Sequence, residues 1–153
     1  MVKTGRRIAL MLLLCIALTG AKCGDNEAGI SKAIRATDDL RAGIAAAEQL
    51  TTQLGQDKHI TPAQEKQINL LLLGVNSATK IFYAEVVKAR EAGQWNADIK
   101  SHLAGTFAAV NVELQKLNTA GIFDTNNSDS KQKLELVLKT MNAAAALVQV
   151  SLQ

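Results

Sequence analysis

The sequence predicts an all-α protein, an up-down-up-down four-helix bundle that follows an N-terminal export signal. Long segments carry apolar residues every three to four positions, the single proline stands where a helix would begin, and no run alternates long enough to form a strand. Four such segments joined by short connections run antiparallel. We therefore expect residues 1–22 to be a signal peptide, 23–29 a flexible tether and 30–153 one bundle domain.

The signal peptide is predicted from a basic start followed by a short apolar stretch. Lys3, Arg6 and Arg7 are charged, and the fourteen residues from Ile8 to Ala21 are not. As a helix this stretch would be about 21 Å long, less than the ~30 Å hydrocarbon core of a membrane, which favours an export signal over a spanning anchor. Cleavage after Ala21 would release the chain into the bacterial periplasm or cell envelope.

Cys23 stands directly after this segment, and Leu18-Thr19-Gly20 precedes it. The arrangement resembles the start of bacterial lipoproteins, and the resemblance implies that Cys23 is acylated. That motif has a small residue immediately before the cysteine, whereas this chain has Lys22. Two interpretations stay open, a lipid on Cys23 or ordinary cleavage that leaves a thiol. Membrane contact is expected only through the signal peptide or such a lipid.

The charge balance depends on the signal segment. The whole chain has 17 Lys and Arg against 14 Asp and Glu, and three of the basic residues precede Ile8. Their removal leaves a net charge of zero, so the composition gives no reason to expect a nucleic-acid partner. Cys15 would be removed as well, which leaves one cysteine and no internal disulfide.

The first two helices are predicted around the turn at residues 56–60. The first runs from about Gly29 to Leu54 and is closed by Gly55. The second begins at the N-cap Thr61, with Pro62 at its first position and Gln64 placed to complete a capping box. It ends at Gly93. Its buried stripe is expected to contain Ile68, Leu71, Leu72, Val75, Ala78, Thr79, Phe82, Val86 and Ala89.

The third helix is capped by Asn96, has Asp98 in its first turn and ends at Gly121, and the fourth is capped near Ser128. A shift of 66 residues aligns Gly55 with Gly121 and also aligns three apolar residues of the second helix with residues of the fourth. These aligned pairs are Leu70 with Leu136, Leu72 with Leu138 and Ala78 with Ala144. The two halves would then both be helix-Gly-turn-helix units.

Residues that could carry catalysis, a cofactor or a metal ion are scarce. The histidines are His59 and His102, and neither belongs to a Glu-x-x-His, His-Glu-x-x-His or haem-attachment motif. Asp38 and Asp39 are adjacent carboxylates, but neighbours on a helix point about 100° apart. We therefore predict no enzyme activity, no catalytic, cofactor-binding or metal residue, and no cofactor.

The second helix is apolar on the side opposite its stripe, where Leu70, Leu73, Ser77, Ile81 and Ala84 recur. Either its core stripe is wide and a few exposed leucines are tolerated, or this side is a second interface. The resulting hypothesis is an exported, non-catalytic bundle that binds a protein partner or a copy of itself through helix faces. The alternative is an envelope enzyme or cofactor-carrying bundle whose site residue spacing does not reveal.

Overall fold

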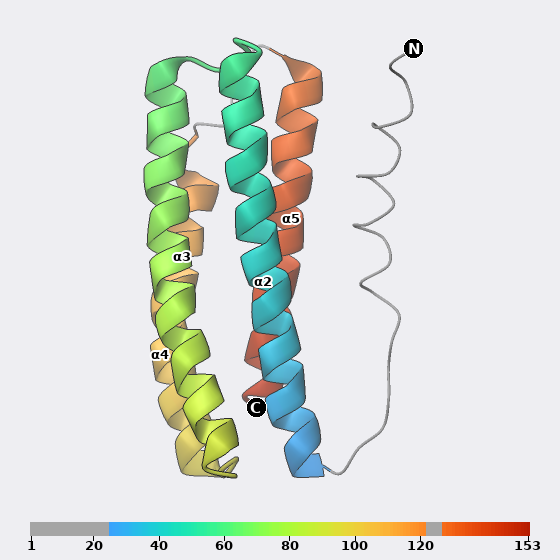
Figure 1. Cartoon of the computed structure of the whole chain (residues 1–153), viewed down its shortest axis with the longest axis vertical. Coiled ribbons are helices and arrows are strands. Elements are labelled where there is room, and N and C mark those ends of the chain that lie inside the picture. Colours follow the sequence, from blue (N-terminus) through green and yellow to red (C-terminus); the bar gives the residue numbers. More distant parts are fainter. Residues whose placement is uncertain (1–24, 122–126) are drawn as a thin grey trace.

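The computed structural model describes residues 25–121 and 127–153, which form four helices packed against one another (Figure 1). They are α2 (Asp25–Gln56), α3 (Pro62–Glu91), α4 (Ala97–Thr119) and α5 (Ser128–Ser151). Each helix runs antiparallel to the next, and the described ranges contain no strand. The prediction of an all-α fold with four helices is confirmed. The predicted signal peptide and Cys23 lie outside the described residues.

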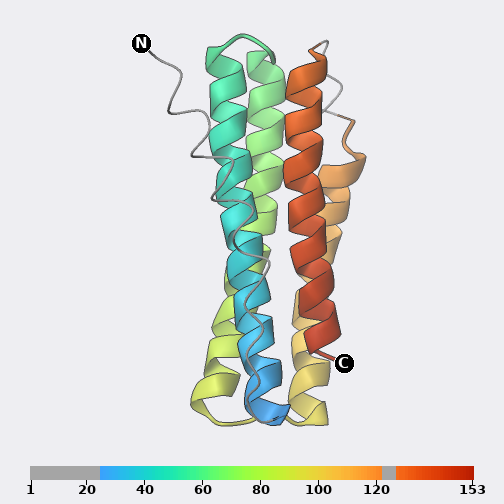
Figure 2. The same cartoon turned by 90° about the vertical axis from the view of Figure 1, so that its right-hand side faces the viewer.

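The four helices stand at the corners of the bundle, and neighbours in the chain are neighbours in space. α2 packs against both α3 and α5, and α3 also packs against α4 (Figure 2). α4 and α5 share the sparsest contact, which includes a reciprocal amide pair, Asn118 Nδ2 to Asn142 Oδ1 at 3.0 Å and Asn142 Nδ2 to Asn118 Oδ1 at 3.1 Å. α3 and α5 are therefore diagonal to each other.

The core contains apolar side chains from all four helices, as the spacing predicted. The rings of Phe82 and Phe107 meet edge to face between α3 and α4, with centroids 4.8 Å apart. Each helix contributes fully buried residues, among them Leu40 and Ile44 of α2, Leu72 of α3, Leu103 and Leu117 of α4, and Leu134 and Met141 of α5. Threonines are accepted in this core because each hydroxyl bonds to the carbonyl four residues earlier, at 2.6–2.7 Å for Thr37, Thr51 and Thr79.

The predicted ends of α3 are confirmed. Thr61 Oγ1 accepts from Gln64 N at 3.2 Å, and Gln64 Oε1 accepts from Thr61 N at 2.9 Å, which is the capping box. At the other end Gly93 has φ +63°, and Gln94 N donates to Ala89 O at 2.9 Å. This left-handed ending suits glycine because glycine has no Cβ.

The predicted end of the first helix is wrong. α2 continues through Gly55 to Gln56, and Lys58 adopts the left-handed conformation with φ 57°. His59 N donates to Leu54 O at 2.9 Å and Lys58 N to Gly55 O at 3.1 Å, so the turn is the same kind of cap as at Gly93. Gly55 instead lies beside the Glu65 carboxylate, which occupies the place of a Cβ.

The predicted tether is also wrong over residues 25–29, because α2 begins at Asp25. Gly29 is helical, and a Cβ there would collide with the indole of buried Trp95, 2.9 Å from its Cδ1. Glycine at this position therefore permits close packing between α2 and the α3–α4 turn.

The N-caps of the last two helices differ in how well the sequence located them. Asn96 caps α4 as predicted, and its Oδ1 accepts from Ile99 N at 2.9 Å. For α5 the cap predicted near Ser128 is the preceding residue Asn127, whose Oδ1 accepts from both Asp129 N and Ser130 N at 3.1 Å.

Candidate interaction surface

The five residues singled out on the second helix all lie on the exposed side of α3. Leu70 is 59% exposed, Leu73 58% and Ile81 63%, and Ser77 and Ala84 between and beyond them are exposed as well. We call this set the α3 stripe. Their exposure fits both interpretations, a wide core stripe with a few tolerated exposed leucines and a second interface.

The α3 stripe exists because α3 is apolar on both sides. Its buried side takes Ile68, Leu72, Val75, Thr79 and Phe82 into the core. By length and composition alone, α3 could cross a membrane, because it contains an 18-residue stretch of high hydropathy. Only 28% of that stretch is buried in the structure. The core helix of a soluble protein with such a composition is usually mostly buried, so the exposed apolar residues of α3 need an explanation.

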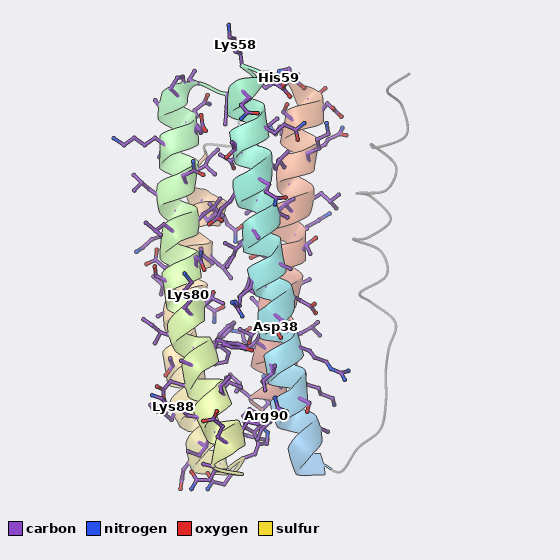
Figure 3. All side chains as sticks on the ribbon, in the orientation of Figure 1. Asp38, Lys58, His59, Lys80, Lys88 and Arg90 are labelled. Atoms are coloured by element: carbon purple, nitrogen blue, oxygen red, sulfur yellow. The ribbon has the colours of Figure 1, made fainter. Side chains whose placement is uncertain are left out.

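Lysines border the stripe at its ends and along one edge. Lys66 is one helical turn before Leu70, Lys88 is one turn after Ala84, and Lys80 directly precedes Ile81. Figure 3 labels Lys80 and Lys88 on α3. The nearby Glu85 is paired: its Oε1 is 2.7 Å from Lys88 Nζ, and its Oε2 is 3.7 Å from His102 Nε2 of α4. The hydrogen bond and charge of Lys88, followed by those of His102, lower the pKa of the Glu85 carboxyl.

A shallow, open hollow of about 420 Å³ lies at the N-terminal end of the stripe. Its lining comes from the first three turns of α3 and consists of Pro62, Glu65, Lys66, Asn69, Leu70 and Leu73. Such a hollow can receive a side chain from another protein surface. It lacks the enclosure that small-molecule sites use to remove a ligand from water.

A second hollow, of about 390 Å³, lies between the N-terminal half of α4 and the C-terminal end of α5. Residue spacing did not predict it, because the tilt between two helices is set by how all four pack. Its lining contains Ala104, Phe107, Ala108, Asn111, Gln149, Leu152 and Gln153, among which no side chain titrates. This hollow therefore offers shape and amide groups but no acid, base or nucleophile.

The void that lies among core residues is much smaller than either surface hollow. One core void of about 10 Å³, lined in part by Ala47, Thr51 and Leu117, is roughly the size of one water probe. Within residues 25–121 and 127–153, no three His, Cys, Asp or Glu side chains come together as metal ligands would. His59 Nδ1 lies 3.2 Å from the Asn127 amide nitrogen.

The adjacent carboxylates of α2 occupy different surroundings. Asp38 is exposed and pairs with Arg41 at 3.4 Å, and Arg41 in turn stacks over Tyr83 of α3, 4.8 Å from the ring centroid. Asp39 is half-buried, and burial, followed by the charge of Asp38, raises the pKa of its carboxyl. Asp38 therefore joins α2 to α3 through Arg41, and the two carboxylates do not converge on a shared site.

Comparison of the chain with protein-family models finds no match. Comparisons with curated proteins and with solved structures find no match either, so any function for this chain has to be argued from its own surface.

Proposed function

We propose that this protein is an exported, non-catalytic helical bundle that binds another protein molecule, a different chain or a second copy, through the α3 stripe. The observation that carries the proposal is the exposure of Leu70, Leu73 and Ile81 on one side of a helix whose other side is fully packed. Contiguous apolar surface of this kind is typical of protein interaction sites.

The free energy available from covering the stripe is useful but limited. Complete burial of a Leu or Ile side chain is worth about 1.5–3 kcal/mol, so covering three that are already partly buried gives roughly 3–5 kcal/mol. Association itself costs at least ~4 kcal/mol in lost freedom. The partner must therefore add contacts around the stripe, for which the hollow beside Leu70 is available.

The place of action proposed is the bacterial periplasm or cell envelope. The support is the basic start, the fourteen uncharged residues and the junction around Cys23 in the sequence. Intact-mass analysis of the exported protein tests this: we expect an N-terminus at Lys22 or Cys23, and a mass with acyl groups would decide for a lipid on Cys23. Retention of residues 1–21 would contradict export by cleavage.

The interaction is tested with the double variant Leu70→Lys with Leu73→Lys. The matched control is Val112→Lys, since Val112 of α4 is 51% exposed and stands outside the stripe. We expect the double variant to lose self-association in sedimentation and capture of envelope proteins, while Val112→Lys keeps both. Far-UV circular dichroism should be unchanged for both variants.

Two results would contradict the proposal. If the double variant associates and captures as the unchanged protein does, the stripe is not an interface. If it unfolds, its leucines contribute to the core and the surface described above is not free.

A further inference from the structure

The seam between α4 and α5, meaning the line along which these two helices meet, is built differently from the other helix contacts. It is the sparsest of the four contacts between neighbouring helices, whereas α2 and α5 share the most extensive one. α2 and α5 approach closely because the residues between them are small: a Cβ on Gly43 would lie 3.8 Å from the Met141 Cα, and Ala36 and Ala47 are buried on the same side of α2. α4 instead buries Leu, Phe and Val side chains, which need more space between helix axes.

The edges of the α4–α5 seam carry alanines and amides that do not fill this space. Ala104, Ala108 and Asn111 of α4 lie across the hollow of about 390 Å³ from Gln149 and Leu152 of α5. A further hollow, of about 320 Å³, shares Ala104 and Leu152 with the first and continues toward the N-terminal end of α4. The seam is therefore open to solvent beside the first turns of α4.

Beyond the hollows the seam is bridged by the amide pair of Asn118 and Asn142, whose two hydrogen bonds are 3.0 and 3.1 Å long. Both side chains are exposed. Water can replace either partner in such bonds, so their net contribution to stability is small. The pair sets the register of α4 against α5 without tying the two helices firmly together.

The other three contacts are better suited to remain closed. Arg41 of α2 stacks on Tyr83 of α3, 4.8 Å from the ring centroid, and the rings of Phe82 and Phe107 meet edge to face between α3 and α4. Between α2 and α5, Met141 lies directly against Gly43. Separation of α4 from α5 would leave these contacts in place.

We propose that the bundle opens along the α4–α5 seam, so that the α2–α5 pair and the α3–α4 pair move apart with the α2–α3 contact as the hinge. Regions of low contact density with exposed hydrogen bonds open at a lower free energy than the whole protein unfolds. The open form exposes the inner sides of α4 and α5. This inference concerns the interior of the bundle, and it holds or fails independently of the α3 stripe.

Two adjacent alanines of α5 can report on its two seams separately. Ala145 lies on the side of Asn142 and Gln149, which is turned toward α4, and Ala144 lies on the side of Met141, which is turned toward α2. Ala144 is 4% exposed and Ala145 5%. Ala144→Cys and Ala145→Cys therefore place equally buried thiols on the two sides of one helix.

The test measures how fast each thiol reacts with iodoacetamide at increasing concentrations of urea. After trypsin digestion, mass spectrometry of the peptide that follows Lys139 gives the labelled fraction, and the reporter is the one cysteine in that peptide. Without urea we expect the thiol of Ala145→Cys to react at least about tenfold faster than that of Ala144→Cys, because opening of the seam exposes only the first. Near the midpoint of unfolding the two rates should become equal.

A second pair of variants tests whether the hollow sets the ease of opening. Ala108 lines the hollow, whereas its neighbour Ala109 is exposed outside it. Ala108→Leu should fill the hollow with apolar side chain and slow the labelling of Ala145→Cys several-fold, and Ala109→Leu should leave that rate unchanged.

Equal rates for the two thiols at every urea concentration would overturn the inference. If both are slow, the bundle opens only by global unfolding, and if both are fast, α5 unravels as a whole. Faster labelling of Ala144→Cys would place the opening between α2 and α5 instead, and equal effects of Ala108→Leu and Ala109→Leu would also contradict the proposal. Should a cysteine at 144 or 145 unfold the bundle, Val137→Cys and Leu138→Cys, which replace partly buried residues on the corresponding sides of α5, take their place and are scored by the same outcomes.

Discussion

Lys58 offers a sharp test of the turn between α2 and α3, because it holds a backbone conformation that glycine adopts more readily. Its φ is 57°, it is exposed, and it projects from the end of the bundle (Figure 3). The left-handed conformation costs a residue with a Cβ about 1–2 kcal/mol. Glycine avoids this cost but loses ~0.5–1 kcal/mol through its more flexible unfolded chain. Lys58→Gly should therefore gain about 0.5–1 kcal/mol from the backbone.

The comparison that isolates this effect is Lys58→Gly against Lys58→Ala. Both remove the favourable charge of a lysine at a helix C-terminus, worth about 0.3–1 kcal/mol, and only the glycine variant relieves the backbone. Thermal unfolding followed by circular dichroism should give the glycine variant a Tm higher than that of the alanine variant by about 2–5 °C. Equal melting temperatures would show that residue 58 is not left-handed and would refute the cap described above.

Three further changes probe the core, the helix contacts and one titrating group. Phe82→Ala should lower the free energy of unfolding in urea by ~3–5 kcal/mol, and a loss below about 1 kcal/mol would mean that the ring is not buried between helices. Gly105→Ala should raise the free energy of unfolding by ~0.5–1 kcal/mol because a Cβ there meets open space. Gly43→Ala should lower it because the new Cβ would lie 2.8 Å from Met141 Cγ. Equal gains for the two variants would show that the packing of α5 against α2 described above is wrong. The pKa of the Asp39 carboxyl is raised in the folded state, so the folded chain binds this proton more tightly than the unfolded chain does. The protonated carboxyl therefore favours folding, and this contribution is lost as the pH rises through the folded-state pKa. Asp39→Asn should therefore have a higher Tm than the unchanged protein near pH 7, and this difference should disappear near pH 3. A higher Tm in acid only would show that the pKa of Asp39 is lowered in the folded state instead of raised.

The parts of the fold that could be predicted depend on residues close together in the sequence. The cap of α3 needs only Thr61, Pro62 and Gln64, and these groups bond to each other over three residues. The buried side of each helix follows from a period of 3.6, because a helix in a bundle has one side that meets its neighbours. These features hold whatever the distant parts of the chain do.

The glycines show where sequence reasoning failed. Gly55 was expected to end a helix and Gly29 to belong to a tether, yet both are helical. Glycine serves equally at a helix end and at a point of close approach, and the difference lies in what stands opposite. Here Glu65 and Trp95 occupy those places, and neither contact can be inferred from the residues next to the glycine.

The exposed apolar residues of α3 and α5 differ in how far the sequence reveals them. Leu70 to Leu73 is a run of four leucines, so an apolar side opposite the core side was visible in the sequence of α3. On α5 the exposed Leu136, Leu147 and Val150 stand among alanines, which fit core or surface equally well. Only the diagonal placement of α3 and α5 shows that both apolar sides face outward and away from each other.

The burial of Trp95 gives the protein an internal optical probe. It is the one tryptophan of the chain, so the whole indole emission arises at the end of the bundle where α2 begins. In its packed position beside Gly29 the indole is shielded from water, and opening of this end would shift its emission to longer wavelength. Comparing that shift with the loss of helical circular dichroism would show whether the base of the bundle opens before the rest or together with it.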